Sequence, residues 1–244
     1  MIIALIPSRL NSKRLNKKPL LVIDGLPIII HTLKRVLLSK KVDKAIVCTD
    51  SLEIKKIVEL NGGEAVLTSN KHRNGTERIA EVAKKYKKAK LIIDVQGDEP
   101  LVDPGDIDKV ITFHQKNNNF DIVVPVKSTK NPDDKTLIKV VFSNTKKIIY
   151  FSRAKIPFNY TNNKINYFKD LSVISFTPNA LKIFSKLKPG FLEKIEGIEL
   201  LRAIENDLSI GTFVAKGSSF GVNVKQDLLR AIDEMSRNKI RKLY

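Results

Sequence analysis

The chain of 244 residues has a single cysteine, no tryptophan and only three histidines. One cysteine excludes a disulfide framework and argues against a cysteine metal site. Cys48 lies in an apolar run, which indicates a buried structural thiol. His31, His72 and His114 are far apart in the sequence, so we expect no histidine cluster that would bind a metal.

Long apolar runs are also missing. The apolar N-terminal segment Met1–Pro7 is only a few residues long, and no basic segment precedes it. No stretch approaches the roughly 20 apolar residues of a membrane span. We therefore expect a cytoplasmic protein without membrane insertion. No Gly-x-Ser-x-Gly, Walker or Cys-x-x-Cys pattern occurs, which disfavours hydrolase, ATPase and zinc-protein functions.

Acidic residues are few: 26 against 44 basic residues, a net charge of +18. Such a charge favours nucleic acid or a small anionic substrate as partner. However, 34 of the basic residues are lysine, which shares AT-rich codons with the abundant asparagine and isoleucine. The lysines are scattered, as in Lys40-Lys41 and the run Lys84–Lys88, and no basic run alternates with aromatic residues. The sequence therefore predicts a solvated lysine surface and no nucleic-acid partner.

Apolar segments alternate with amphipathic segments in the first half of the chain, which is typical of a parallel sheet covered by helices. Strands are predicted at Ile2–Ile6, Ala45–Thr49 and Leu91–Val95, and helices at Pro27–Lys40, Leu52–Leu60, Gly75–Lys85 and Asp106–Gln115. The predicted fold is α/β and Rossmann-like, with a mostly parallel central sheet and helices on both faces.

The second half changes character and predicts a smaller mixed lobe. A strand is expected at Ile122–Val126, and Ile138–Phe142 and Ile148–Phe151 are expected to form an antiparallel hairpin. The later elements are a surface loop at Asn159–Asp170, strands at Leu171–Phe176 and Ile210–Ala215, and helices from Pro178, at Glu193–Asn206 and at Lys225–Arg237.

A polar loop after the first strand carries three cations, Arg9, Arg14 and Lys18. Ligands of open α/β sheets bind at the carboxyl ends of the strands, which is where this loop begins. Three cations at this spacing suit a triphosphate, because Arg makes forked contacts and Lys acts as a point charge. A solvated loop in a basic protein is the alternative.

The segment Gln96–Pro100 follows the strand Leu91–Val95 directly. Its acidic pair, Asp98 and Glu99, would suit Mg²⁺, which prefers one or two carboxylates together with phosphate oxygens. The alternative is an ordinary turn that ends a strand. The position of the pair beside the cationic loop favours the metal.

Taken together, these segments resemble the CMP-KDO synthetase family, the 3-deoxy-manno-octulosonate (KDO) cytidylyltransferases. The resemblance runs from Ile2 to Asp227, and Gln96–Pro100 and Phe151–Pro157 are its most specific parts. The other matching segments are Pro7–Leu20, Thr49-Asp50, Gly75–Arg78 and Gly221–Asn223.

The resemblance implies transfer of CMP from CTP to the anomeric hydroxyl of a 3-deoxy-ulosonic acid, KDO first, with release of pyrophosphate. The product would serve lipopolysaccharide or another surface polysaccharide. No covalent intermediate is required, so catalysis would rest on positioning and charge neutralisation. The implied catalytic residues are Arg9, Arg14, Lys18 and Asp98. The implied nucleotide-binding residues are Ser8, Arg9, Ser12, Arg14, Lys18, Gly75, Thr76 and Arg78.

The same resemblance implies the sugar side of the site and the assembly. The implied sugar-binding residues are Gln96, Arg153 and Glu199, and Mg²⁺ would be held by Asp98 and Asn223. The chain would form one cytidylyltransferase domain, with residues 1–126 as a nucleotide-binding core and residues 127–244 as a sugar-binding and dimerisation lobe. A homodimer is the expected assembly.

Departures from the family concentrate on the sugar side. Asn223 stands where the family has an aspartate, Asp170 and Ile174 replace a histidine and a tyrosine, and Leu200 replaces a glutamine. Lost hydrogen-bond partners change which substrate is accepted. The alternatives are therefore a related sugar acid, such as an 8-amino KDO analogue or a nonulosonic acid, or a CTP-binding homologue that has lost turnover. Asp170 would suit a substrate amine.

Overall fold

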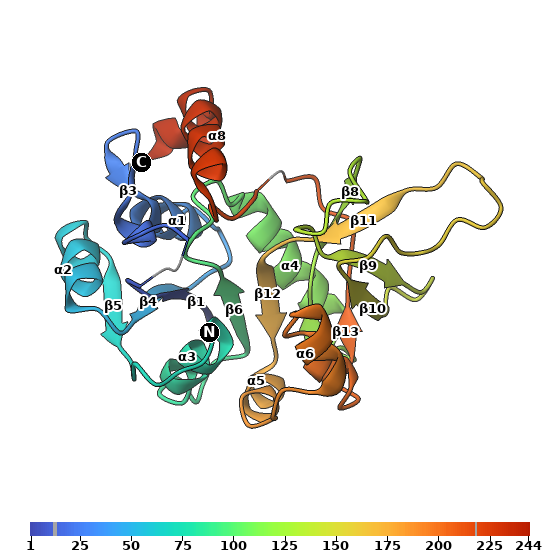
Figure 1. The fold of residues 1–244 in the computed structure, drawn as a ribbon. Coiled ribbons are helices and arrows are strands. Elements are labelled where there is room, and N and C mark those ends of the chain that lie inside the picture. The colour runs from blue at the N-terminus through green and yellow to red at the C-terminus, as the bar shows by residue number, and fades with distance from the viewer. Residues whose placement is uncertain (12–13, 218) are drawn as a thin grey trace.

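The computed structural model describes residues 1–11, 14–217 and 219–244 (Figure 1). Within these residues a seven-stranded sheet forms the centre, in the order β13-β7-β12-β6-β1-β4-β5. Its strands are β1 (Ile2–Ser8), β4 (Lys44–Thr49), β5 (Glu64–Leu67), β6 (Leu91–Val95), β7 (Ile122–Val123), β12 (Val173–Phe176) and β13 (Ile210–Gly211). Neighbours are parallel except at β12, which is antiparallel to both β6 and β7. The predicted mostly parallel sheet is confirmed.

Helices cover both faces of this sheet because the central strands are apolar on both sides. In β1, Ile3 and Leu5 belong to one apolar cluster, and Ala4 and Ile6 to another, as the alternation of a strand requires. The first cluster includes residues of α3 (Gly75–Ala83) and α5 (Pro178–Phe184), and the second includes residues of α1 (Ile28–Leu37), α2 (Leu52–Leu60) and α4 (Pro104–Lys116). The sheet is thus the middle layer of three.

A smaller antiparallel sheet forms the second lobe, in the order β10-β9-β11-β8. Its strands are β8 (Val126–Thr129), β9 (Lys139–Phe142), β10 (Ile148–Ser152) and β11 (Tyr167–Asp170). The predicted hairpin is confirmed as β9 and β10. A long loop between β10 and β11 extends away from the body of the molecule (Figure 1). Because β12 and β13 return to the central sheet, the two halves of the chain share one sheet, and the division at residue 126 stays a prediction.

Several predicted elements differ in detail. The expected loop at Asn159–Asp170 ends in β11, because Phe168 packs on Phe142 with ring centroids 5.2 Å apart. The expected helix Glu193–Asn206 is instead two helices, α6 (Phe191–Glu196) and α7 (Leu201–Ile204). Gly197 divides them with a φ of 64°, a left-handed conformation that ends helices.

The expected strand Ile210–Ala215 shortens to β13, after which Val214 makes only an isolated bridge to Val126. The last long helix is α8 (Lys225–Ser236), close to its predicted bounds. The small elements are η1 (Lys18–Leu20), β2 (Val22–Ile23), β3 (Leu26–Pro27) and η2 (Lys239–Leu243). No helix in the described ranges is long and apolar enough to cross a membrane.

Candidate functional site

A cleft of about 550 Å³ opens at the carboxyl ends of β1 and β6. Segments far apart in the sequence meet there, as expected of a parallel sheet. Its lining residues are Pro7, Ser8, Arg9, Arg14, Lys18, Pro19, His72, Arg73, Asn74, Gly75, Arg78, Gln96, Gly97, Asp98, Glu199 and Asn223.

Close approach of the two strand ends shapes the floor of this cleft. A side chain at Gly97 would place its Cβ 2.6 Å from the Pro7 carbonyl oxygen, so only glycine fits there. Ser8, at the end of β1, is 6% exposed, and its hydroxyl has no hydrogen-bond partner in the described part of the chain. A buried hydroxyl without a partner is costly, and a ligand in the cleft would supply one.

Two cations and two oxygen ligands meet on one side of the cleft. Lys18 Nζ lies 2.5 Å from Asp98 Oδ2 and 3.4 Å from Asn223 Oδ1. Arg14 donates from Nη2 to the same Asn223 oxygen at 2.8 Å. The Val222 amide donates to the Asp98 carbonyl at 2.9 Å, which fixes the two loops together.

The oxygens of Asp98 and Asn223 would suit a hard divalent cation whose other ligands come from phosphate and water. The described residues contain no group of three or more acidic, histidine or cysteine side chains that would hold a metal alone. Any metal here would therefore depend on the ligand for its coordination.

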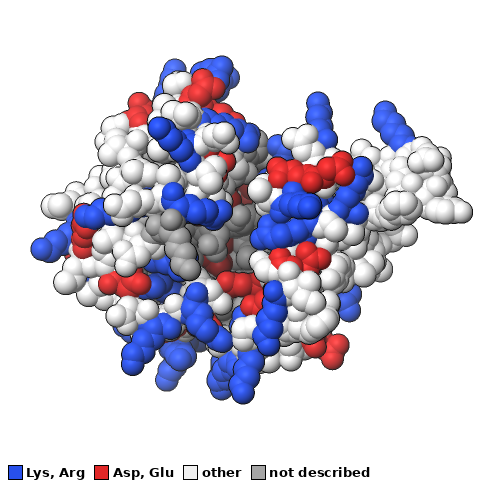
Figure 2. Space-filling model, in the orientation of Figure 1, with Lys and Arg blue, Asp and Glu red and all other residues white. Residues whose placement is uncertain are grey.

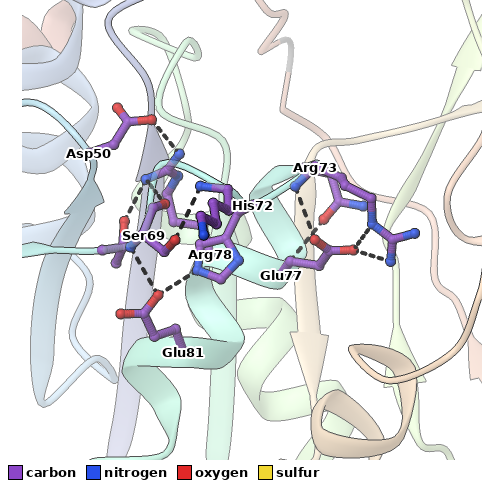
Figure 3. Close-up of polar contacts among 10 residues, drawn as sticks. Asp50, Ser69, His72, Arg73, Glu77, Arg78 and Glu81 are labelled. Carbon is purple, nitrogen blue, oxygen red and sulfur yellow. Dashed lines mark hydrogen bonds and ion pairs between the residues drawn. The ribbon is translucent and has the colours of Figure 1, made fainter.

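The segment before α3 also lines the cleft, and Figure 3 shows the polar contacts that hold it. Asn74 caps α3 by accepting from the Glu77 amide at 2.9 Å. Arg73 Nε donates to Glu77 at 2.6 Å, and His72 bonds Glu81, which lowers the pKa of the Glu81 carboxyl. Sequence reasoning did not assign His72, Arg73 and Asn74 to the site. The cap residue ahead of the helix and the four-residue spacing from Arg73 to Glu77 were the available signals.

The predicted nucleotide residues do not all lie in the cleft lining. Ser8, Arg9, Arg14, Lys18, Gly75 and Arg78 line it. Arg78 is nearly fully buried, and its guanidinium pairs with Asp50 at 2.7 Å (Figure 3). Thr76 is not a lining residue and donates to Glu199 at 2.9 Å. Ser12 lies outside the residues that the structure describes.

One fully buried acid, Asp94, lies beneath the cleft and orients Gln96. The Gln96 amide donates to both oxygens of Asp94, at 3.0 and 3.1 Å. Burial raises the pKa of Asp94 well above its usual range, and the neighbouring Glu199 raises it further. Burial also raises the pKa of Glu199. Because the Gln96 nitrogen is engaged below, its carbonyl oxygen is left to face the cleft as an acceptor.

Arg153 is not a cleft-lining residue. Its side chain donates to backbone carbonyls of Glu196 at 2.9 Å, Lys135 at 3.1 Å, and Thr136 and Gly197 at 3.4 Å. It forms no ion pair with a carboxylate of the described residues. The backbone N–H of Arg153 donates to the Glu196 carboxylate at 2.8 Å, but the guanidinium itself is hydrogen-bonded only to carbonyl oxygens.

Asp170 is the last residue of β11, and the charge of Arg153 acts on its carboxylate. It is half-buried, and its carboxylate has no ion pair and no side-chain hydrogen bond among the described residues, although its own backbone N–H donates to it. Burial raises the pKa of Asp170 to about 7; the charge of Glu99 adds to this, and Lys169 and Arg153 oppose it. Ser172 lies two residues after Asp170. Its backbone carbonyl accepts a hydrogen bond from the backbone N–H of Gln96 at 3.5 Å. Asp170 is not itself a cleft-lining residue, but the chain that leads from it to Ser172 reaches Gln96 at the cleft.

Comparisons with known proteins agree on one family. The family model described as cytidylyltransferase matches residues 3–210. The chain is 35% identical to the 3-deoxy-manno-octulosonate cytidylyltransferase of Leptospira biflexa over 239 residues, 97% of each chain. It is 36% identical to the 8-amino-3,8-dideoxy-manno-octulosonate cytidylyltransferase of Shewanella woodyi over 230 residues, 92% of this chain and 94% of that one.

A solved structure of CMP:2-keto-3-deoxy-manno-octonic acid synthetase complexed with CTP is also similar. It has a TM-score of 0.93 and 29% identity, and the alignment covers 97% of this chain and 98% of that one.

Proposed function

The chain belongs to the cytidylyltransferase family, and on that premise we propose that it joins CMP from CTP to a 3-deoxy-ulosonic acid. KDO is the leading substrate, and the product would serve lipopolysaccharide synthesis. The observation that carries the proposal is the cleft, which three cations line and where two of them, Arg14 and Lys18, contact the oxygen pair of Asp98 and Asn223. That arrangement suits a metal-bound nucleoside triphosphate.

The reaction forms a bond between the anomeric oxygen of the sugar acid and the α-phosphorus of CTP. The bond from that phosphorus to the bridging oxygen of pyrophosphate breaks, pyrophosphate leaves with the electron pair, and the proton of the anomeric hydroxyl is released to water. Arg9, Arg14 and Lys18 would bind the triphosphate and stabilise the charge that develops on pyrophosphate. The Ser8 hydroxyl would find its missing partner in the nucleotide.

We propose Mg²⁺ as the cation at Asp98 and Asn223, because a carboxylate and an amide oxygen fit its preference for oxygen ligands. When bound, it would neutralise phosphate charge and polarise the α-phosphate. Asn223 contributes no formal charge, so the ion would depend more on Asp98 and on the phosphates.

The sugar acid would bind at the Gln96 end of the cleft. Gln96 offers an acceptor, and Glu199 is held by Thr76. Arg153 has only neutral partners for its guanidinium, so a substrate carboxylate would be its natural counter-ion.

An amino-substituted sugar acid is a second candidate substrate, and Asp170 is the observation that favours it. Its carboxylate has no ion-pair partner among the described residues, and a substrate ammonium group that reached it would neutralise it. The chain is 36% identical to an 8-amino-3,8-dideoxy-manno-octulosonate cytidylyltransferase and 35% identical to a KDO enzyme, so identity alone does not separate the two substrates.

We propose that the chain acts in the cytoplasm as a homodimer formed by the second lobe, with no nucleic-acid partner. Phe158 and Tyr160 on the extended loop are 84% and 86% exposed, which is unusual for large aromatic side chains unless a partner covers them. Light scattering on the wild type and on a Phe158→Ser/Tyr160→Ser variant tests this. A wild-type monomer at micromolar concentration would refute the dimer.

Pyrophosphate release tests the function directly. CTP, UTP and ATP would each be combined with KDO, with its 8-amino analogue and with a nonulosonic acid, in the presence of Mg²⁺. We expect release only with CTP and a 3-deoxy-ulosonic acid. Release with none of the sugar acids, although CTP binds, would instead indicate a homologue without turnover.

A further inference from the structure

Two lysine-rich segments, distant in the sequence, meet at the end of the sheet opposite the cleft. The turn at residues 84–90 links α3 to β6 and lies at the amino end of β6. Because β12 is antiparallel to β6, with Phe176 opposite Ile92, the helix that follows β12 begins at that same end. Helices α3 and α5 contact each other there.

The result is a dense group of exposed ammonium groups, called here the α3–α5 lysine patch. It consists of Lys84, Lys85, Lys87, Lys88, Lys90, Lys182, Lys186 and Lys188. All eight are exposed, and none forms an ion pair among the described residues. The space-filling view shows basic side chains along the lower edge, over α3 and α5 (Figure 2). Exposed Ile183 lies within the patch.

We propose that the α3–α5 lysine patch docks the protein on an anionic lipid bilayer. Clusters of four to eight basic residues bind anionic headgroups through summed, weakly specific attraction, and lysine suffices for it. Exposed Ile183 would add a small apolar contact. No stacking aromatic residue is exposed within the patch, which disfavours single-stranded nucleic acid.

Position supports this surface as a docking face. The patch lies at the amino end of β6, whereas the cleft lies at its carboxyl end, so a docked protein keeps its cleft open. The proposal rests on the exposed lysines and their place in the fold, and it does not require the proposed function. The proposed function adds one reason, because the reaction that consumes a CMP-sugar for lipopolysaccharide is a glycosyl transfer to a lipid-anchored acceptor.

Vesicle co-sedimentation of the full chain tests the proposal. The vesicles are phosphatidylcholine alone or phosphatidylcholine with phosphatidylglycerol. The patch variant carries Lys84→Gln, Lys87→Gln, Lys88→Gln and Lys186→Gln. The matched control carries Lys130→Gln, Lys147→Gln, Lys164→Gln and Lys225→Gln, which removes the same charge from exposed positions elsewhere.

We expect the wild type to bind only the anionic vesicles, and the patch variant to lose about tenfold or more in partitioning. The control should lose about twofold or less, and binding should weaken with salt. Equal losses in both variants would refute a localised site, as would wild-type binding that ignores phosphatidylglycerol. Displacement of the protein from anionic vesicles by trace duplex DNA would favour nucleic acid instead.

Pyrophosphate release in solution should be the same in both variants and the wild type. If no protein releases pyrophosphate, the proposed function fails while the vesicle result still decides the docking surface.

Discussion

Replacing Asp170 with asparagine should stabilise the fold, and the gain should grow as the pH rises from 5 to 8. The Asp170 carboxylate is half-buried at the end of β11 and has no ion pair among the described residues; its own backbone N–H is too weak a donor to offset burial. The ionised form is therefore poorly solvated in the folded state, and Glu99 repels it. Asparagine has nearly the same shape and no charge to desolvate.

The pKa values set the size and sign of the effect. Burial raises the pKa of Asp170 from its usual 3.8 to about 7 in the folded protein. The folded state therefore binds the proton more tightly, and the side chain reduces stability progressively as the pH rises from about 4 to about 7. The pKa difference between the folded and unfolded states lowers the free energy of unfolding by about 4 kcal/mol above pH 7. At pH 5 the same difference lowers it by about 1.5 kcal/mol.

Urea unfolding of the wild type and Asp170→Asn at a series of pH values measures this difference. The slope of the free energy with urea should stay constant, so that the midpoint alone reports stability. Asp133→Asn is the matched control, because the Asp133 side chain is 77% exposed and its removal should change stability little at any pH.

A gain from Asp170→Asn that is equal at pH 5 and pH 8 would refute the raised pKa. A loss of stability at pH 8 would show that the ionised carboxylate has a partner. With substrates, the same variant should lose any preference for an amino sugar acid over KDO while its CTP binding is retained.

Three further substitutions test the site and its support. Asp98→Asn should lower the rate of pyrophosphate release about 100-fold or more, as expected when a charge that holds the metal is lost, and should weaken Mn²⁺ binding measured by electron paramagnetic resonance in the presence of CTP. Gly97→Ala should cost about 1–3 kcal/mol in urea unfolding, because its Cβ would collide with the Pro7 carbonyl oxygen; unchanged stability would contradict that contact. Glu193→Gln should cost about 3–5 kcal/mol by the same measurement, because it leaves the buried Arg202 guanidinium unpaired.

The centre of the fold could be predicted because its strands are apolar on both faces. β1, β4 and β6 appear in the sequence as short apolar runs followed by turn residues. Five short strands were missed, namely β2, β3, β5, β8 and β11, and two of them show the physical reason. β5 and β11 are short, include polar residues and are partly exposed, so they carry no apolar run, and pairing with neighbours defines them.

The candidate site was predictable where one loop supplies several groups of the same chemistry. Arg9, Arg14 and Lys18 follow one strand, so topology alone directs them to the cleft. His72 and Arg73 reach the cleft only because Asn74 starts α3 beside the end of β1, and that packing leaves little trace in local sequence. The engagement of Arg153 by backbone carbonyls likewise depends on the α6–α7 turn.

Strand β12, which is antiparallel to both of its neighbours, runs from the cleft end of the central sheet to the end that carries the α3–α5 lysine patch. Its first residue, Val173, lies opposite Val95 beside the cleft, and its last, Phe176, leads into α5 and the α3–α5 lysine patch. Four strand residues span about 13 Å, and the screening length at physiological salt is about 8 Å. Charge changes in the patch should therefore leave the pH dependence at Asp170 unaltered. Measuring Asp170→Asn in the patch variant checks this, and a shift in its pH dependence would mean that the two ends are coupled through the sheet.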